Sequence, residues 1–204
     1  MIYEMAIVAK SSSSDEQIDK IKDMVNQVAK DYEGEVLLTD DWGRKQFAQT
    51  AKDGSQTGHY LYFIYRANNE ANTELARRMK INEQVHKSLT VKLGEEADSE
   101  AILKAYKTPY SKAHQGSQTD ELERGSDKDK RKFAKRKACW FTTNKITADW
   151  KDPKTYAWLV NEFGKISPAR VSGVSRKHHR WAESAIKRAR NIGLISHLAG
   201  NTAE

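Results

Sequence analysis

The chain begins with alternating apolar positions that predict a covered β-strand. From Ile2 to Val8 both phases of the alternation are largely apolar, which is typical of a strand packed on both faces. A helix is expected next, because Ser14 and Gln17 can form a capping box and apolar residues then recur at helical spacing until Gly34. These two elements open the predicted fold.

Residues 35–91 predict further strands and a second helix. We expect extended structure at 35–38, a turn at 40–45 and extended structure again from Phe47, followed by a polar loop at 52–58. An aromatic strand is expected at 59–66. A helix capped by Asn69 should then continue through Met79, and a last strand should follow at 85–91. The order βαββαβ predicts an α+β ferredoxin-like fold, with an antiparallel sheet and two helices on one face. Both phases of the aromatic strand are apolar, so we expect the open face of the sheet to be covered.

The pattern changes beyond residue 97. Residues 98–129 are polar, with only a weak helical pattern at 101–106, and predict a linker. Farther on, Asp152 and Pro153 predict the start of a helix that ends at Gly164, and Ser175 can cap a final helix reaching about Ile192. We therefore expect a ferredoxin-like domain at 1–97, a polar linker at 98–129 and a basic, mostly helical module at 130–204.

Charge divides the chain in the same way. Residues 128–204 hold 18 Lys and Arg against 6 Asp and Glu, whereas residues 1–127 hold 17 against 22, within a formal net charge of +7. A segment with this excess of cations, interleaved with tryptophans, is suited to neutralising phosphates with release of counterions. Nucleic acid is therefore the first partner to expect.

The final predicted helix separates apolar from cationic positions. Its apolar arc holds Trp181, Ala182, Ala185, Ile186, Ala189 and Ile192, and its opposite arc holds Arg176, Lys177, Arg180, Lys187 and Arg188. Glu183 can pair with Lys187 at i, i+4, but the other cations on that arc have no carboxylate within a turn. A solvated surface helix is the plain alternative; a membrane-surface helix is disfavoured because the apolar arc is mostly alanine.

At this point two resemblances become visible. The segment 163–173, the Ala-Ile-Lys-Arg-Ala-Arg block at 185–190 and Gly193-Leu194 resemble bacterial small-subunit ribosomal protein eighteen, over about residues 130–200. Residues 1 to about 97 resemble small-subunit ribosomal protein six in the opening 2–4, in Trp-Gly-Arg-Lys at 42–45 with Phe-Ala at 47–48, and in Gly-His-Tyr at 58–60. The chain is thus similar to a fusion of the two.

The resemblance implies a function. In bacteria these two proteins bind each other and the central domain of the small-subunit ribosomal RNA. It therefore implies a structural constituent of the small ribosomal subunit, with neighbouring ribosomal proteins as further partners and with the two modules docked on each other. The expected RNA-contacting residues, from the resemblance and from the basic pattern together, are Arg44, Lys45, Lys132, Lys135, Arg136, Lys137, Lys165, Arg170, Arg176, Lys177, Arg180, Lys187, Arg188 and Arg190.

Some of these assignments leave alternatives open. Arg44 and Lys45 lie beside Asp40 and Asp41, so a local salt bridge is nearly as good a role for them. Trp42 is expected in the core or an interface rather than in base stacking. We expect no metal or other cofactor: some members of the eighteen family carry Cys-x-x-Cys, but the corresponding stretch here is Cys-Trp-Phe-Thr at 139–142. His178 and His179 diverge on a helix and are expected to be surface donors.

Other classes of protein fit less well. An RNA-recognition motif needs a basic and aromatic fingerprint, of which Thr-Gly-His-Tyr at 57–60 supplies only the glycine. An acylphosphatase-type enzyme needs a phosphate-binding loop with glycines and an arginine, which Lys-Ser-Ser-Ser-Ser at 10–14 lacks, so we expect no enzymatic activity. A basic RNA- or DNA-binding regulator outside the ribosome remains the alternative. A single cysteine, no long apolar run and a strand beginning at Ile2 favour a cytoplasmic protein with no membrane partner, and the resemblance implies that it is ribosome-bound.

Overall fold

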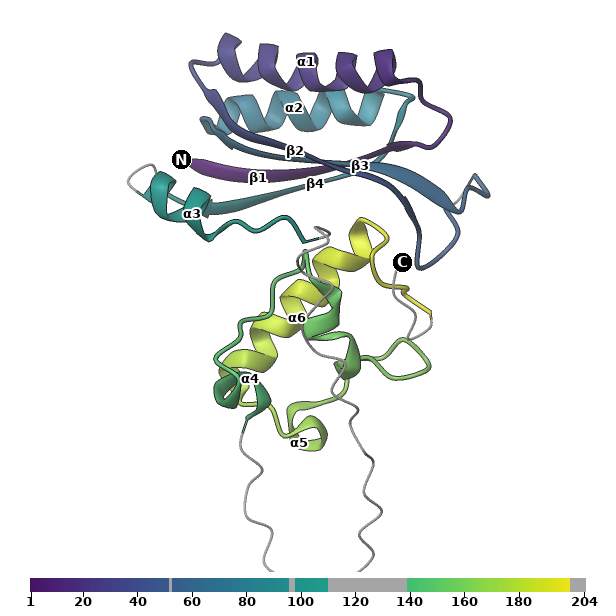
Figure 1. Cartoon of the computed structure of the whole chain (residues 1–204), viewed down its shortest axis with the longest axis vertical. Helices are drawn as coiled ribbons and strands as arrows, with labels where there is room; N and C mark the ends of the chain where they lie inside the picture. Colours follow the sequence, from purple (N-terminus) through teal and green to yellow (C-terminus); the bar gives the residue numbers. More distant parts are fainter. Residues whose placement is uncertain (52, 96–97, 110–138, 199–204) are drawn as a thin grey trace, which may run out of the picture.

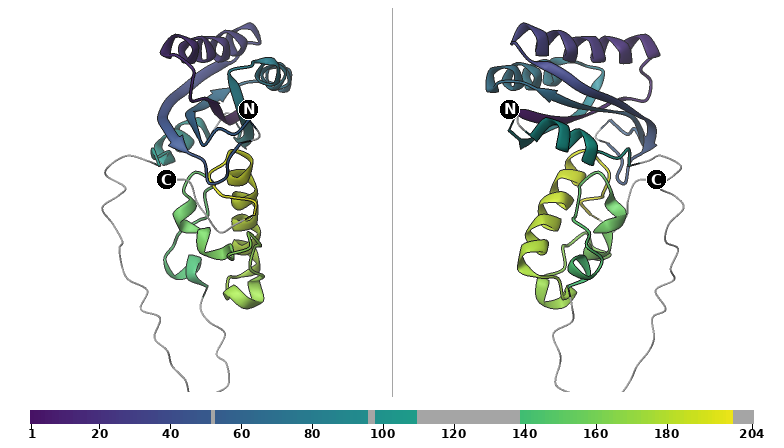
Figure 2. Two further views of the ribbon diagram at one scale, coloured as in Figure 1. Left: turned by 90° about the vertical axis from the view of Figure 1, so that its right-hand side faces the viewer. Right: turned by 60° about the vertical axis from the view of Figure 1, so that its left-hand side comes forward.

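The structure, a computed structural model, describes residues 1–51, 53–95, 98–109 and 139–198. Two bodies lie one above the other: a body of strands and helices formed by the first part of the chain, and a smaller helical body formed by the last part (Figure 1). Two other views show the same arrangement (Figure 2). The sheet lies between a layer of two helices on one side and the second body on the other.

A four-stranded antiparallel sheet forms the centre of the first body. Its strands are β1 (Ile2–Lys10), β2 (Glu35–Gln46), β3 (Thr57–Arg66) and β4 (Val85–Gly94). They lie in the order β2-β3-β1-β4, and each neighbouring pair is antiparallel. With a helix after β1 and another after β3, this is the ferredoxin-like arrangement, so the predicted fold class is confirmed.

Both predicted helices form and cover one face of the sheet. α1 (Asp15–Asp31) begins at the predicted capping box, in which Ser14 and Gln17 each accept a backbone N–H of the other. α2 (Asn69–Ile81) begins with Asn68 as its cap, one residue before the predicted position. The apolar sides of both helices pack with one phase of the strands into a first hydrophobic core.

The turn predicted at 40–45 is wrong, because β2 continues through these residues. The register of β2 against β3 shifts between Asp41 and Gly43, which marks a bulge. Gly43 takes a φ of 74°, and its N–H donates to the Asp41 carboxylate at 2.9 Å. Aspartate and glycine are turn residues, but they serve a bulge equally well, since both features need a positive φ and a local hydrogen bond.

Most of the second body consists of short elements packed around one long helix. These are α4 (Trp140–Thr143), the 3-10 turns η3 (Pro153–Thr155) and η4 (Ala157–Leu159), α5 (Ala169–Ser172) and α6 (Arg176–Asn191). The final helix was predicted with its Ser175 cap, and both are confirmed: the Ser175 hydroxyl accepts the His178 N–H.

The helix predicted between Asp152 and Gly164 is wrong. Two 3-10 turns replace it, separated by Tyr156 at φ −140° and ψ −2°, and the Asp152 side chain makes no cap. Val160 then forms an antiparallel bridge with Ile166, so the chain reverses at 161–165 instead of continuing a helix. Tyr156 and Leu159 are buried, but Phe163, which the predicted helix would place on the same face, is 75% exposed.

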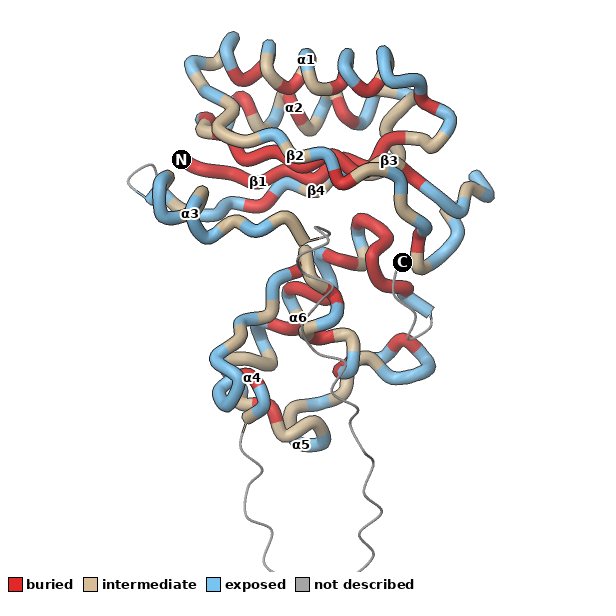
Figure 3. The backbone as a smooth tube through the Cα atoms, in the orientation of Figure 1, coloured by how far each residue is buried: buried red, intermediate tan, exposed pale blue. Residues whose placement is uncertain are grey.

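The second face of the sheet packs against the second body. Tyr60 and Tyr62 of β3, with Ile2, Ala6 and Val8 of β1, share one hydrophobic core with the buried side of α6 and with Trp150. Buried segments meet from both sides at this contact (Figure 3). The Tyr60 hydroxyl donates to the Ile192 carbonyl at 2.8 Å, which ties the end of α6 to the sheet. The apolar open face expected from the sequence is thus covered by the chain itself.

A buried carboxylate joins the two bodies at the same contact. Glu4 of β1 is 2% exposed and accepts three hydrogen bonds: from the Tyr62 hydroxyl at 2.6 Å, from the Trp150 indole at 2.7 Å and from the Lys151 ammonium at 3.0 Å. Trp42 lies beside this group, 6% exposed and stacked on Tyr62 at 5.2 Å, in the core position expected from the sequence.

The segment predicted as a linker starts with structure of its own. α3 (Ser99–Ala105) follows the sheet, and Tyr106 then stacks on Tyr62 at 4.9 Å and donates to Asp40 at 2.6 Å. The rest of the predicted linker, residues 110–129, lies outside the described residues, and the domain boundaries stay a prediction. In the described part of the chain, no helix combines the length and apolar character needed to cross a membrane.

Candidate nucleic-acid interface

α6 separates its apolar and cationic sides as the sequence predicts. Ala182, Ala185, Ile186 and Ala189 are buried against the rest of the second body and the sheet. Small side chains on this side let the helix approach its neighbours closely, and the Ile192 and Leu194 that follow complete the packing. Trp181, expected on the same arc, is instead 41% exposed.

The opposite side of α6 is cationic and exposed. Five predicted RNA-contacting residues lie there: Arg176, Lys177, Arg180, Lys187 and Arg188. Lys187 pairs with Glu183 at 2.5 Å, as predicted, and this pairing lowers the pKa of the Glu183 carboxyl. Among the described residues no other cation on this side of α6 has an ion-pair partner. We call these five residues the cationic face of α6.

Arg190 differs from the other cations of the helix because it turns inward. Its guanidinium donates to the Gly164 carbonyl, and burial lowers its pKa. The prediction that Arg190 contacts RNA is not tested, but its position gives it a second role. Its hydrogen bond to Gly164 links the 161–165 reversal, which carries Lys165, to the end of α6.

The connection before α6 presents two more predicted contacts. Lys165 is exposed at the chain reversal, where its N–H donates to the Asn161 side chain at 2.7 Å. Arg170 is exposed on α5, which Gly173 ends in the left-handed conformation at φ 74°. Both cations therefore lie on the second body, as the cationic face of α6 does.

Arg44 and Lys45 lie on β2 in the first body. The two carboxylates suggested as their salt-bridge partners have other contacts. Asp41 contacts His59 at 2.6 Å and Lys22 at 3.5 Å, and Asp40 accepts hydrogen bonds from Trp42 and Tyr106. Arg44 is exposed, whereas partial burial lowers the pKa of Lys45. Four further predicted contacts lie outside the described residues: Lys132, Lys135, Arg136 and Lys137.

His178 is not the surface donor that the sequence suggested. Its Nδ1 lies 2.9 Å from the Ser175 hydroxyl and 3.4 Å from the Cys139 sulfur, and its ring stacks on Phe141. Burial alone would raise the pKa of Cys139, but hydrogen bonds from Ser175 and Thr142 outweigh it and lower the pKa to about 6. Within the described ranges no three His, Cys, Asp or Glu side chains are grouped as metal ligands.

A group of exposed aromatic rings was missed by the sequence reasoning. Trp140, Trp158 and Trp181 come from α4, η4 and α6, and all three keep more than a third of their surface exposed. The available signal was the unusual number of tryptophans in a basic segment. Trp140 contacts Trp158, which lies on a 3-10 turn that replaced part of the predicted helix, and Trp181 joins the group through His178.

Comparison with known families assigns a class to both bodies. Residues 2–92 match the family model of ribosomal protein S6, and residues 144–195 match that of ribosomal protein S18. The chain is therefore a small-subunit ribosomal protein. It belongs to the ribosomal protein S18 family through its C-terminal part and carries a ribosomal protein S6 domain in front of that part, so it is a fusion of the two.

Two bS18 relatives agree with the match to the S18 family model. Small ribosomal subunit protein bS18 of Citrifermentans bemidjiense is 51% identical over 75 residues, which are 36% of this chain and 80% of that protein. The bS18 of Treponema pallidum is 40% identical over 75 residues, 37% of this chain and 76% of that protein. The crystal structure of ribosomal protein S6 from Thermotoga maritima matches at 16% identity and a TM-score of 0.44, over 50% of this chain and 96% of that one.

Proposed function

We propose that this chain binds the central domain of the small-subunit ribosomal RNA through its second body. The observation that carries the proposal is the cationic face of α6, where five exposed cations share a single ion pair within the described part of the chain. Lys165 and Arg170 extend the same charge along the connection before the helix. Exposed, unpaired cations spread along a helix suit contacts to phosphates better than contacts to base edges, because base readout needs a few side chains converging in a groove.

The two bodies have different tasks in this proposal. The acidic first body adds packing area and orients the second, and Arg44 and Lys45 are its expected RNA contacts. The shared core around Tyr60 and Tyr62 and the hydrogen bonds to Glu4 support the view that the bodies act as one docked unit. Neighbouring small-subunit proteins are the remaining partners, and the expected location is on the ribosome in the cytoplasm, with a structural rather than an enzymatic role.

Charge reversal on α6 tests the proposal. Lys187→Glu combined with Arg188→Glu should weaken binding of the full chain to a central-domain rRNA fragment by about tenfold or more. Because each lost phosphate contact lowers the slope of log K against log salt by about 0.7–0.9, the loss of two should make the slope shallower by roughly 1.4–1.8. Equilibrium binding measured at several salt concentrations gives both quantities.

A matched control separates position from overall charge. Lys20→Glu combined with Lys30→Glu makes the same change in net charge on α1, on the side of the sheet away from the second body (Figure 1). The control variant should retain a slope near that of the original chain. Equal losses of RNA affinity in both variants would show that only the net charge matters. An unchanged salt slope in the α6 variant would refute the proposed phosphate contacts.

A further inference from the structure

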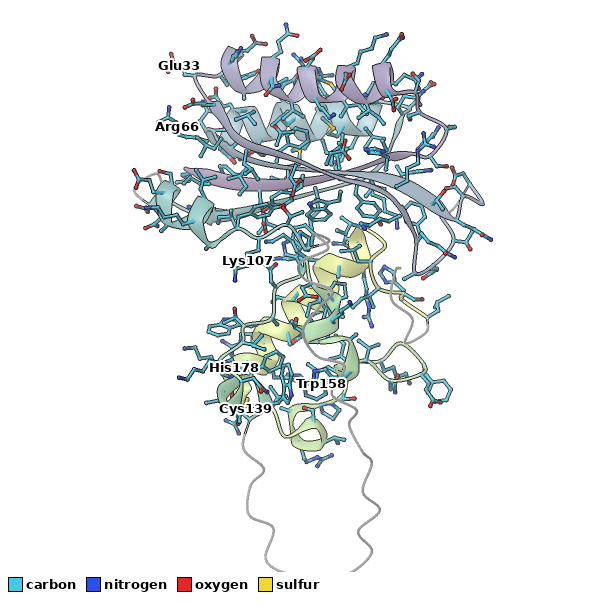
Figure 4. All side chains as sticks on the ribbon, in the orientation of Figure 1. Glu33, Arg66, Lys107, Cys139, Trp158 and His178 are labelled. Carbon is cyan, nitrogen blue, oxygen red and sulfur yellow. The ribbon has the colours of Figure 1, made fainter. Side chains whose placement is uncertain are left out.

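Aromatic side chains from three elements meet at the end of the second body that lies farthest from the sheet. Figure 4 shows Trp158, Cys139 and His178 together at this end. Trp140 and Phe141 come from α4, Trp158 from η4, and His178 and Trp181 from the first part of α6. We call the five rings the aromatic cluster: Trp140, Phe141, Trp158, His178 and Trp181.

The rings form a continuous series of contacts. Trp140 and Trp158 meet edge to face at 5.8 Å, and each also contacts Phe141, at 5.1 Å and 6.2 Å. Phe141 stacks on His178 at 5.7 Å, and His178 meets Trp181 at 5.3 Å. Phe141, the ring that contacts three of the others, is only 1% exposed. The cluster therefore has a buried centre and three tryptophans at its rim.

The three rim tryptophans are open to a partner. Trp140 is 37% exposed, Trp158 is 44% exposed and Trp181 is 41% exposed. The Trp158 indole N–H donates to the Thr155 carbonyl, but those of Trp140 and Trp181 have no acceptor within the described part of the chain. Large aromatic surfaces gathered in one exposed place usually mark a binding site, since leaving them in water is unfavourable.

Cations surround the cluster at the start of α6. Lys177 lies over the Trp181 ring, with its ammonium 4.8 Å from the ring centre, and Arg176 and Arg180 are exposed on the first turns of the same helix. In the sequence, the basic run at 128–137 ends just before Cys139, which precedes α4. The charges next to the rings are thus positive, as an anionic partner with flat apolar groups requires.

A shallow hollow continues from the cluster along α6. It measures about 370 Å³ and includes Trp181, Ser184 and Arg188 in its lining. The carboxylates in the same lining, Glu4 and Asp149, both pair with Lys151. With Lys151 shared by two carboxylates, Arg188 brings the lining to formal neutrality, so the hollow adds a cation of the cationic face of α6 but no net positive charge.

We propose that the aromatic cluster is a stacking site for unpaired bases of single-stranded RNA. The rim tryptophans offer faces to the bases, while Arg176, Lys177 and Arg180 neutralise the phosphates between them. This inference rests on the proposed RNA-binding function and makes it more specific: α6 contacts the backbone, and the cluster at its start holds nucleotides outside a duplex. A protein partner fits less well, because the positive charge around the rings matches a nucleic-acid backbone.

The test compares two RNA probes on the full chain. Trp181→Ala should weaken binding of a ten-nucleotide single strand by roughly 5- to 150-fold, the loss expected for one stacked base. Binding of a blunt-ended RNA duplex of about ten base pairs, which has no unpaired bases, should stay within about twofold. The salt slope should not change for either probe, because the substitution removes no charge. Trp181→Phe keeps a ring and should restore part of the affinity.

Phe163→Ala is the control for Trp181→Ala. Phe163→Ala removes an aromatic ring that is 75% exposed and has no ring partner among the described residues, so single-strand affinity should stay unchanged. Unaltered single-strand affinity in Trp181→Ala, or equal losses for single strand and duplex, would overturn the stacking site and leave the rings as a contact for a protein. If the original chain bound neither RNA, the proposed function itself would fail.

Discussion

At the scale of single residues, Glu4 has the most constrained environment in the contact between the two bodies. Its three partners are all donors: a hydroxyl, an indole N–H and an ammonium. A carboxylate has two acceptor oxygens and no proton to offer, so it satisfies all of them at once. Burial, together with the nearby Glu4 charge, raises the pKa of Tyr62, which keeps the tyrosine a donor. The position therefore selects a carboxylate rather than any polar group.

Glu4→Gln should destabilise the protein by about 1–3 kcal/mol although the two side chains have nearly the same shape. Glutamine supplies only one acceptor oxygen, and its amide would face at least one of the donors from Tyr62, Trp150 and Lys151. Lys151 retains a salt bridge to Asp149 at 2.9 Å, which limits the loss. Urea denaturation of the full chain measures the change in free energy of unfolding.

Glu162→Gln is the control for Glu4→Gln. Glu162 is exposed, so the same chemical change there should alter stability by less than about 0.5 kcal/mol. A Glu4→Gln protein with the stability of the original chain would show that the buried hydrogen bonds do not hold the two bodies together.

At the scale of elements, the sequence was most informative where local signals agreed. α1 and α6 each combine a serine cap with an apolar stripe of helical period, and both formed where expected. The four strands were predicted because alternating or continuous apolar runs are separated by polar segments. Neither signal needs knowledge of distant contacts, since each arises from neighbours along the chain.

The incorrect elements share a physical cause. An Asp-Pro pair and two buried residues spaced by three are compatible with a helix and with 3-10 turns. The non-local contacts of Tyr156, which is buried in the core shared with the sheet, favour the turns. Likewise Asp41 and Gly43 fit a turn or a bulge, and continued pairing with β3 selects the bulge. Local sequence could not distinguish these alternatives because it does not contain the deciding contacts.

Gly164 is the element boundary most sensitive to substitution. Its φ is 71°, and a β-carbon there would lie 2.5 Å from the His197 carbonyl oxygen. Gly164→Ala should therefore cost the usual penalty for a left-handed alanine, about 1–2 kcal/mol, and at least about 1 kcal/mol more for the backbone clash. Because Arg190 and Lys165 meet at this reversal, the substitution should also weaken RNA binding. Thermal unfolding and the rRNA binding assay measure the two effects.

Gly54→Ala is the control for Gly164→Ala, because it introduces backbone strain without a steric clash. Gly54 has a φ of 83°, but a β-carbon there meets nothing within 4 Å. Gly54→Ala should show only the conformational penalty and normal RNA binding. Equal destabilisation by the two substitutions would contradict the close approach of His197 to Gly164.

At the scale of the whole molecule, the fusion brings two differently charged modules into a fixed one-to-one ratio. Joining the modules in one chain makes their association an intramolecular step. The cores of the two modules merge at the sheet face opposite α1 and α2. In the structure, apolar side chains of both modules are buried in this shared core.

The candidate site was predictable only in its charge pattern. The helical wheel identified the cationic face of α6 because periodicity separates the two sides of a helix wherever it packs. It did not show that Arg190 turns toward Gly164 or that three tryptophans from separate elements meet, since both depend on how the elements pack in space. The residues of the 128–137 run remain a prediction.

A density map of small ribosomal subunits assembled with this chain tests the central claim most directly. The account predicts that Arg176, Arg180 and Arg188 lie within hydrogen-bonding distance of rRNA phosphates, while α1 lies on the side away from the RNA contact. A map in which that side of α6 faces solvent, with RNA against α1 instead, would contradict it.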